Sequence, residues 1–181
     1  LIPILTIFLC LFMVVPVLAE GEDAENGFAD EYYRLLDMAS LLSDEEVDSL
    51  TSRLDELSLR QKMDVVIATT DTLDGKSVVE YADDLYDYCS FGYGANRDGL
   101  ILVISMEDND WYISTCGYGI TVFTDAGIEY IGKQIVPYLS DSDFAGAFAT
   151  YITLCDEFIT QAKTDKPYDI GTLPREPLSP A

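Results

Sequence analysis

The sequence predicts an α/β domain, a three-layer α/β/α sandwich in which helices flank a small mixed sheet. Residues 64–70, DVVIATT, form a continuous apolar and β-branched run, the pattern of a strand buried on both faces. A helical pattern separates this run from a second one at 100–105, so the two strands are expected to be parallel. Only a short acidic turn separates the second run from 111–116, which predicts a hairpin.

Two capping boxes predict where the first two helices begin. Ser43 is followed three residues later by Glu46, and Ser77 is followed in the same way by Glu80. Apolar residues then recur at helical spacing after each box. We therefore expect a first helix that leads into the strand at 64–70, and a second helix over 78–89.

Two further helices are expected after the hairpin. Thr124 or Asp125 can cap a third helix that reaches Pro137. A fourth apolar face runs from Phe144 to Ala162. Residues 163–181 contain several prolines and show no helical or strand period, so they are predicted to be a tail or linker.

The amino-terminal residues predict export. Residues 1–19 carry no charge and end in a small-residue pattern before Glu20, which indicates a secretory signal peptide. The alternative is an uncleaved membrane anchor of the same length. Residues 20–31 are acidic and poor in apolar side chains, so we expect a disordered leader. This leaves 32–162 as the folded domain, located outside the cytoplasm.

Composition limits both partners and chemistry. The 181-residue chain has 10 basic and 33 acidic residues, a net charge of −23, and such a surface repels nucleic acid while attracting cations. Acidity can also serve only to keep an exported protein soluble. The chain contains no histidine, which excludes Ser-His-Asp and Cys-His nucleophiles and His-ligated zinc. The cysteines show no C-x-x-C spacing.

Acidic residues gather at both ends of the predicted hairpin. Asp98 precedes its first strand and should lie beside Gly117–Gly119, which follow its second strand, and the chain then runs a few residues to Asp125. The turn acids at 107–110 fall at the opposite edge of the sheet. Asp37 precedes the first helix; simple antiparallel packing places it with the turn, whereas a long connection could move it to the other edge.

Carboxylates and backbone carbonyls of a Gly-rich loop are ligands suited to calcium, or alternatively magnesium. Each acid also has a purely structural interpretation. Asp125 can be a helix N-cap, Asp98 a turn residue before a glycine, and residues 107–110 a solvated turn.

The order of these segments resembles the TPM domain family. The resemblance covers roughly 37–159 and rests on Asp37 followed by Leu-Leu-Ser, and on three longer segments: TTDTLDGKSVVEYADDLYD at 69–87, FGYGANRDGLILVIS at 91–105 and STCGYGITVFTDAG at 114–127. It implies a three-layer α/β/α domain, anchored or secreted, with divalent-metal binding or acid phosphatase activity. It also implies Asp37 as a third metal ligand beside Asp98 and Asp125, although many members carry Asn where Asp98 stands. Bacterial members often continue into a membrane helix, so anchoring is expected if the natural chain extends beyond Ala181.

Three classes of function follow from these observations. The first is an exported module that binds calcium and an unidentified protein of the cell envelope. The second is a metal-dependent, acid phosphatase-like hydrolase, for which Arg97 is the one basic residue near the Asp98 end of the hairpin. The third is a purely structural accessory domain near a membrane.

Overall fold

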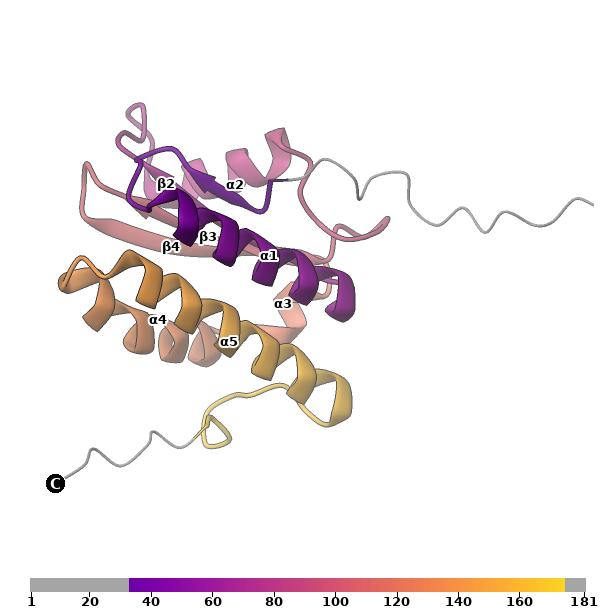
Figure 1. Cartoon of the computed structure of the whole chain (residues 1–181). Coiled ribbons are helices and arrows are strands. Elements are labelled where there is room, and N and C mark those ends of the chain that lie inside the picture. Colours follow the sequence, from indigo (N-terminus) through magenta and orange to yellow (C-terminus); the bar gives the residue numbers. More distant parts are fainter. Residues whose placement is uncertain (1–32, 175–181) are drawn as a thin grey trace, which may run out of the picture. The chain divides into compact units, whose positions relative to one another are not determined.

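The computed structural model describes residues 33–174 (Figure 1). The predicted signal peptide, the whole acidic leader at 20–31, the predicted start of the domain at residue 32, and residues 175–181 lie outside the described residues. In chain order the elements are β1 (Leu35–Asp37), α1 (Asp44–Gln61), β2 (Asp64–Thr70), α2 (Val78–Tyr88), β3 (Gly99–Ser105), β4 (Asp110–Cys116), α3 (Gly119–Val122), α4 (Asp125–Ser140) and α5 (Phe144–Thr164).

The described strands form one mixed sheet in the order β1-β2-β3-β4. β2 and β3 are parallel, with Asp64 opposite Gly99, and β3 and β4 are antiparallel, with Gly99 opposite Cys116. Both pairings confirm the sequence prediction. β1 was not predicted; it adds to the free edge of β2 as a parallel strand, with Asp37 opposite Thr69.

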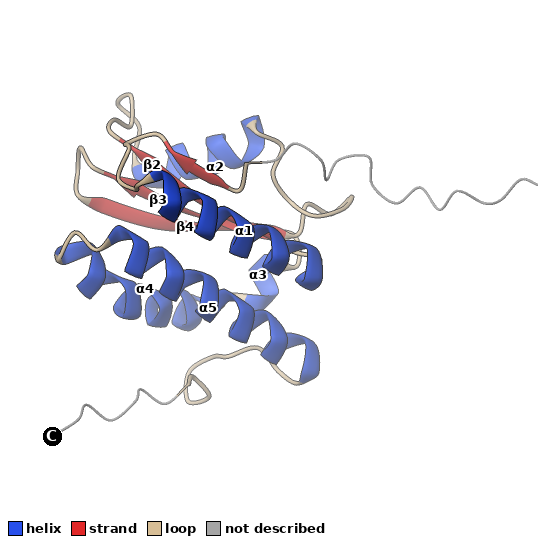
Figure 2. Ribbon diagram, viewed as in Figure 1, coloured by secondary structure: helices blue, strands red, loops and turns tan. Residues whose placement is uncertain are grey.

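Helices cover both faces of the sheet and complete the predicted three-layer sandwich (Figure 2). Side chains alternate along β2: Val65 and Ile67 pack with α1, α4 and α5 on one face, whereas Val66 and Ala68 pack with α2 on the other. The crossover through α1 and the crossover through α2 therefore pass opposite faces while advancing in the same direction across the sheet. They have opposite hands, so one of them departs from the usual right-handed connection.

Helix starts follow the predicted caps. Both capping boxes form, at Ser43 with Glu46 and at Ser77 with Glu80. The Thr124 hydroxyl accepts a hydrogen bond from the Gly127 amide at 3.2 Å, so Thr124 is the N-cap of α4 and Asp125 is its first helical residue. The one-turn helix α3 was not predicted.

The segment predicted as a tail packs against the domain along part of its length. α5 continues to Thr164, and the ring of Tyr168 lies with its centroid 4.8 Å from that of Phe158. The Thr124 hydroxyl donates to the Tyr168 carbonyl at 2.9 Å. The aromatic ring supplies apolar area that a sequence dominated by Pro and polar residues did not suggest.

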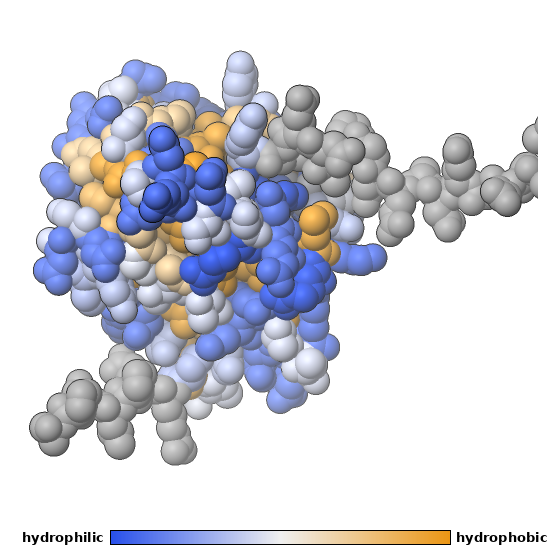
Figure 3. Space-filling view, viewed as in Figure 1, coloured by the Kyte–Doolittle hydropathy of each residue, from blue (hydrophilic) through white to orange (hydrophobic). Residues whose placement is uncertain are grey.

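The described surface is largely polar. Hydrophilic residues dominate the face shown in Figure 3, and apolar side chains interrupt them in patches. Among residues 33–174, no helix has both the length and the apolar character needed to cross a bilayer. The acidic side chains that the sequence singled out as candidate ligands lie at the two edges of the sheet.

Candidate functional site

The predicted ligands lie at two different edges of the sheet. The first, called here the Asp98 edge, is where β2 and β3 begin and β4 ends. α4 starts at this edge and runs toward the other, because Gly132, in its middle, lies against the ring of Trp111 near the start of β4. Asp125 therefore shares the Asp98 edge. Asp37 ends β1, which is parallel to β2, so it lies at the opposite edge with the β3–β4 turn.

Asp37 braces the connection between β1 and α1. One carboxylate oxygen accepts from the Leu41 amide at 3.1 Å and from the Thr69 hydroxyl at 2.6 Å. The other accepts from the Leu42 amide at 2.9 Å. Because Asp37 is at the turn edge, the three predicted carboxylates do not form one ligand set. Its hydrogen bonds give the residue a structural role that its position in the family pattern does not reveal.

Asp98 is held by its backbone and by its side chain. Its amide donates to the Tyr93 carbonyl at 3.0 Å, and its own carbonyl accepts from the Tyr93 amide at 2.9 Å. Its Oδ1 accepts from the Tyr118 amide at 2.6 Å, which ties the β2–β3 connection to the end of β4. The predicted meeting of Asp98 with the 117–119 loop is thus present.

Gly117 brings a second oxygen beside the Asp98 carboxylate. A Cβ on Gly117 would lie 2.3 Å from Oδ1 of Asp98 and 2.6 Å from the Asn96 carbonyl oxygen. Both oxygens therefore pack against the Gly117 Cα, where φ is +57° and a Cβ would not fit. A carboxylate and a backbone carbonyl are ligands that fit a hard cation such as calcium.

The side chains alone do not build a metal centre. Within residues 33–174, no three or more His, Cys, Asp and Glu side chains gather closely enough to hold an ion. A cation at the Asp98 edge would thus depend on backbone oxygens and water in addition to Asp98, with exposed Asp125 as a further carboxylate at the same edge.

Arg97, the basic residue nearest to this edge in the sequence, is engaged inside the fold. Its Nε donates to the Phe91 carbonyl at 2.9 Å, and Nη2 donates to the Tyr86 carbonyl at 2.7 Å. Nη1 forms an ion pair with Asp87 at 2.7 Å, and the guanidinium lies 5.1 Å from the centroid of the Tyr86 ring. Burial raises the pKa of the Tyr86 hydroxyl far above its ordinary value, so this phenol stays neutral.

A buried ion pair that the sequence did not reveal supports the same edge. Asp64 and Arg34 are 3% and 5% exposed, and Arg34 Nε donates to Oδ1 of Asp64 at 2.6 Å. Oδ2 of Asp64 accepts from the Gly92 amide at 2.9 Å. Burial alone would lower the pKa of Arg34, but Asp64 and Asp55 outweigh it and raise that pKa. The loop that carries Asp98 is thus anchored to the start of β2.

The acids of the β3–β4 turn lie at the opposite edge, as predicted. Glu107 accepts from the Leu73 amide at 2.9 Å, and this hydrogen bond is the main reason why its pKa falls below the ordinary value. Asp110 accepts from the Trp111 amide at 2.8 Å. The turn therefore braces the β2–α2 loop while its remaining carboxylate oxygens face solvent.

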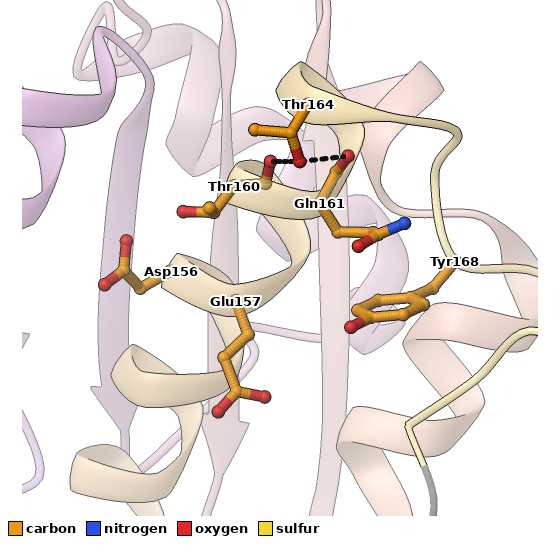
Figure 4. A pocket seen from close by; sticks show the side chains of 6 residues that line it. All are labelled: Asp156, Glu157, Thr160, Gln161, Thr164 and Tyr168. Carbon is orange, nitrogen blue, oxygen red and sulfur yellow. Dashed lines mark hydrogen bonds between the residues drawn. The ribbon is translucent and has the colours of Figure 1, made fainter.

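An open hollow of about 390 Å³ lies along the outer side of α5. Figure 4 shows that its two acids, Asp156 and Glu157, point away from each other. Asp156 forms an ion pair with Arg60 at 3.0 Å, and Thr164 donates back to the Thr160 carbonyl within the helix. The polar groups that line the hollow do not converge on a common point, so we assign no function to this hollow.

A comparison with curated proteins finds a relative that matches most of this chain. It is 28% identical over 148 residues to UPF0603 protein YdjH of Bacillus subtilis (strain 168), an alignment that covers 82% of this chain and 55% of YdjH. The chain thus spans about half the length of this curated relative.

Two solved structures share the fold. The N-terminal domain of a protein from P. gingivalis matches with a TM-score of 0.63 and 18% identity, covering 78% of this chain and 90% of that one. The BA42 protein from Bizionia argentinensis matches with a TM-score of 0.59 and 14% identity, covering 75% of this chain and 91% of that one. A family model described as the TPM domain matches residues 35–158. The chain belongs to the TPM domain family.

Proposed function

We propose that this chain is an exported TPM domain that binds calcium and a protein partner at the cell envelope. We prefer a binding function to phosphatase activity because the Arg97 side chain is already bound within the domain. All three of its side-chain nitrogens are used by Phe91, Tyr86 and Asp87. Phosphoryl transfer needs positive charge around the phosphate. Arg97, next to Asp98 in the sequence, is committed to the fold, and the exposed cation just before β2 is Lys62.

The calcium site in this proposal is built on Asp98. Its Oδ1 already accepts the Tyr118 amide, which fixes the carboxylate and leaves Oδ2 for an ion. The Asn96 carbonyl lies next to the Asp98 carboxylate, and exposed Asp125 starts α4 at the same edge. Calcium accepts carbonyl and water oxygens in a flexible geometry, whereas magnesium demands a near-ideal octahedron, so this mixed oxygen set favours calcium.

Calcium is expected to stabilise the folded chain. At one hundred times its dissociation constant, an ion that binds only the folded state adds about 2.7 kcal/mol. For a domain of this size, that gain raises the melting temperature by roughly 5–11 °C. A thermal melt with and without calcium, followed by circular dichroism, measures the shift.

Two charge-neutral variants test the ligands. Asp98→Asn keeps an oxygen that can accept the Tyr118 amide, and Asp125→Asn leaves the cap untouched because Thr124 provides it. Both variants should lose most of the calcium gain. Asp74→Asn removes the same charge from an exposed residue of the β2–α2 loop, at the opposite edge, whose hydrogen bond to Thr72 uses its backbone amide, and it should keep the full gain. An unchanged wild-type melt would refute the site; calcium-dependent hydrolysis of a phosphate monoester that Asp125→Asn abolishes would favour the phosphatase instead.

Export is the second part of the proposal. It rests on the uncharged apolar residues 1–19 and on the small-residue pattern that ends at Ala19. We expect the mature amino terminus to be Glu20 or to lie within two residues of it. Mass spectrometry of the protein from its native envelope fraction reads the terminus directly; recovery of peptides that contain the intact first nineteen residues would support the membrane anchor.

A further inference from the structure

We propose that a groove at the turn edge binds an extended segment of a partner protein in which basic and apolar side chains alternate. This groove, called here the Trp111 groove, lies between the β3–β4 turn and the α4–α5 turn and encloses about 340 Å³. Figure 1 shows these two turns side by side. The inference deepens the proposed interaction role and is independent of calcium at the Asp98 edge.

The groove has a mixed lining, with polar residues from both turns and a set of large apolar side chains. They include Trp111 from β4, Val136 and Leu139 from α4, and Phe144 from α5. Trp111 and Leu139 are half-buried, and Val136 remains 38% exposed. The Trp111 ring lies against Gly132, where a Cβ would come within 2.2 Å of it, so this glycine sets how closely the ring approaches α4. The groove thus offers a shaped apolar wall rather than a solvated turn.

The two turns that border the groove are acidic. The β3–β4 turn contributes Glu107, Asp108 and Asp110, and the α4–α5 turn contributes Asp141 and Asp143. Between Arg97 and Lys163 the sequence contains a single base, Lys133, which forms an ion pair with Glu129 at 2.7 Å. Negative potential on both sides of an apolar wall is complementary to a cationic partner with an apolar body.

The acidic turns and apolar side chains of the Trp111 groove favour one kind of cationic partner over others. Within the described residues no acidic cluster is arranged to hold a metal ion, and Asp143 uses one oxygen to cap α5 through the Gly146 amide at 2.9 Å. A second copy of the chain, with its net charge of −23, would be repelled. A Lys or Arg side chain can pair with the rim carboxylates or lie over the Trp111 ring, while its apolar neighbours fill the groove. These features favour a basic and apolar peptide segment.

The single tryptophan of the chain provides a direct readout, because it lines the groove. The probe is a capped peptide of six alternating lysine and leucine residues, titrated at low salt in the presence of EDTA. We expect a saturable shift of Trp111 emission that weakens as salt is raised. EDTA separates this experiment from the calcium proposal, since peptide binding in the presence of EDTA does not depend on a calcium ion.

Variants and competing ligands decide the outcome. The double variant Asp110→Asn and Asp143→Asn keeps the cap of α5, since Asn caps as well as Asp, and should weaken binding about tenfold. Asp169→Asn, remote from the groove, should change it less than twofold. Equal binding of a glutamate–leucine peptide, equal binding of hexane-1,6-diamine, or wild-type affinity in the double variant would each overturn the proposal. So would sedimentation showing a dimer that the peptide dissociates, because the occupant would then be a second copy.

Discussion

Replacing Asp64 with alanine should lower the free energy of unfolding by about 3–5 kcal/mol. Arg34 is only 5% exposed, and without Asp64 its Nε would lose the partner that now accepts at 2.6 Å. The Gly92 amide would lose its acceptor as well. Breaking a buried pair from one side costs more than the pair contributes when intact; Arg34 keeps its ion pair with Asp55 at 2.7 Å, so the loss is expected near the lower end of this range. Urea denaturation, with the midpoint and slope fitted separately, measures the loss.

An exposed ion pair provides the matched control. Lys76 and Asp84 are 2.8 Å apart, and their side chains are 46% and 65% exposed. Asp84→Ala should therefore leave the urea midpoint almost unchanged. If Asp64→Ala were as mild as Asp84→Ala, Arg34 would not depend on this carboxylate. The Asp98 loop would then be anchored by its backbone hydrogen bonds alone.

The sequence predicted the elements whose signals are local. Ser43 with Glu46 and Ser77 with Glu80 predicted two helix starts because each cap is complete within four residues. β2 was predicted from its apolar and β-branched run. Such a run arises because all seven residues of the strand are buried in the structure. β1 has only three residues, too few for any period, and its pairing with β2 is a tertiary contact.

Only the part of the site whose position follows from the hairpin could be predicted from the sequence. The hairpin fixes Asp98 beside Gly117, so that juxtaposition followed from the sequence. The edge of Asp37 depends on β1 and therefore stayed open. Asp64 reads as the polar start of a strand, and its pairing with Arg34 joins residues 30 positions apart. The Trp111 groove depends on how the α4–α5 turn meets the hairpin, a tertiary contact that no local pattern in the sequence indicates.

Gly117→Ala is expected to remove both stability and the calcium response. The αL backbone at φ +57° costs a residue with a Cβ about 1–2 kcal/mol. The added methyl would lie 2.3 Å from Oδ1 of Asp98, and such overpacking typically costs a further 1–3 kcal/mol. The total loss of about 2–5 kcal/mol should be visible in a thermal melt. Because the methyl would push the Asp98 carboxylate out of its place, calcium should no longer raise the melting temperature.

Gly119→Ala separates the loss of stability from the loss of the ion. Its Cβ would lie 2.2 Å from the Gly99 carbonyl oxygen, so it also overpacks the Asp98 edge, but neither Asp98 nor Asn96 is among the groups it would approach most closely. This variant should be destabilised by about 1–3 kcal/mol and still gain its full increment from saturating calcium. A calcium gain that survives in Gly117→Ala, or that disappears equally in both variants, would mean that calcium binding does not depend on the placement of the Asp98 carboxylate. A gain kept by Gly119→Ala and lost by Gly117→Ala would locate the ion beside Asp98, because only the methyl at position 117 would displace the Asp98 carboxylate.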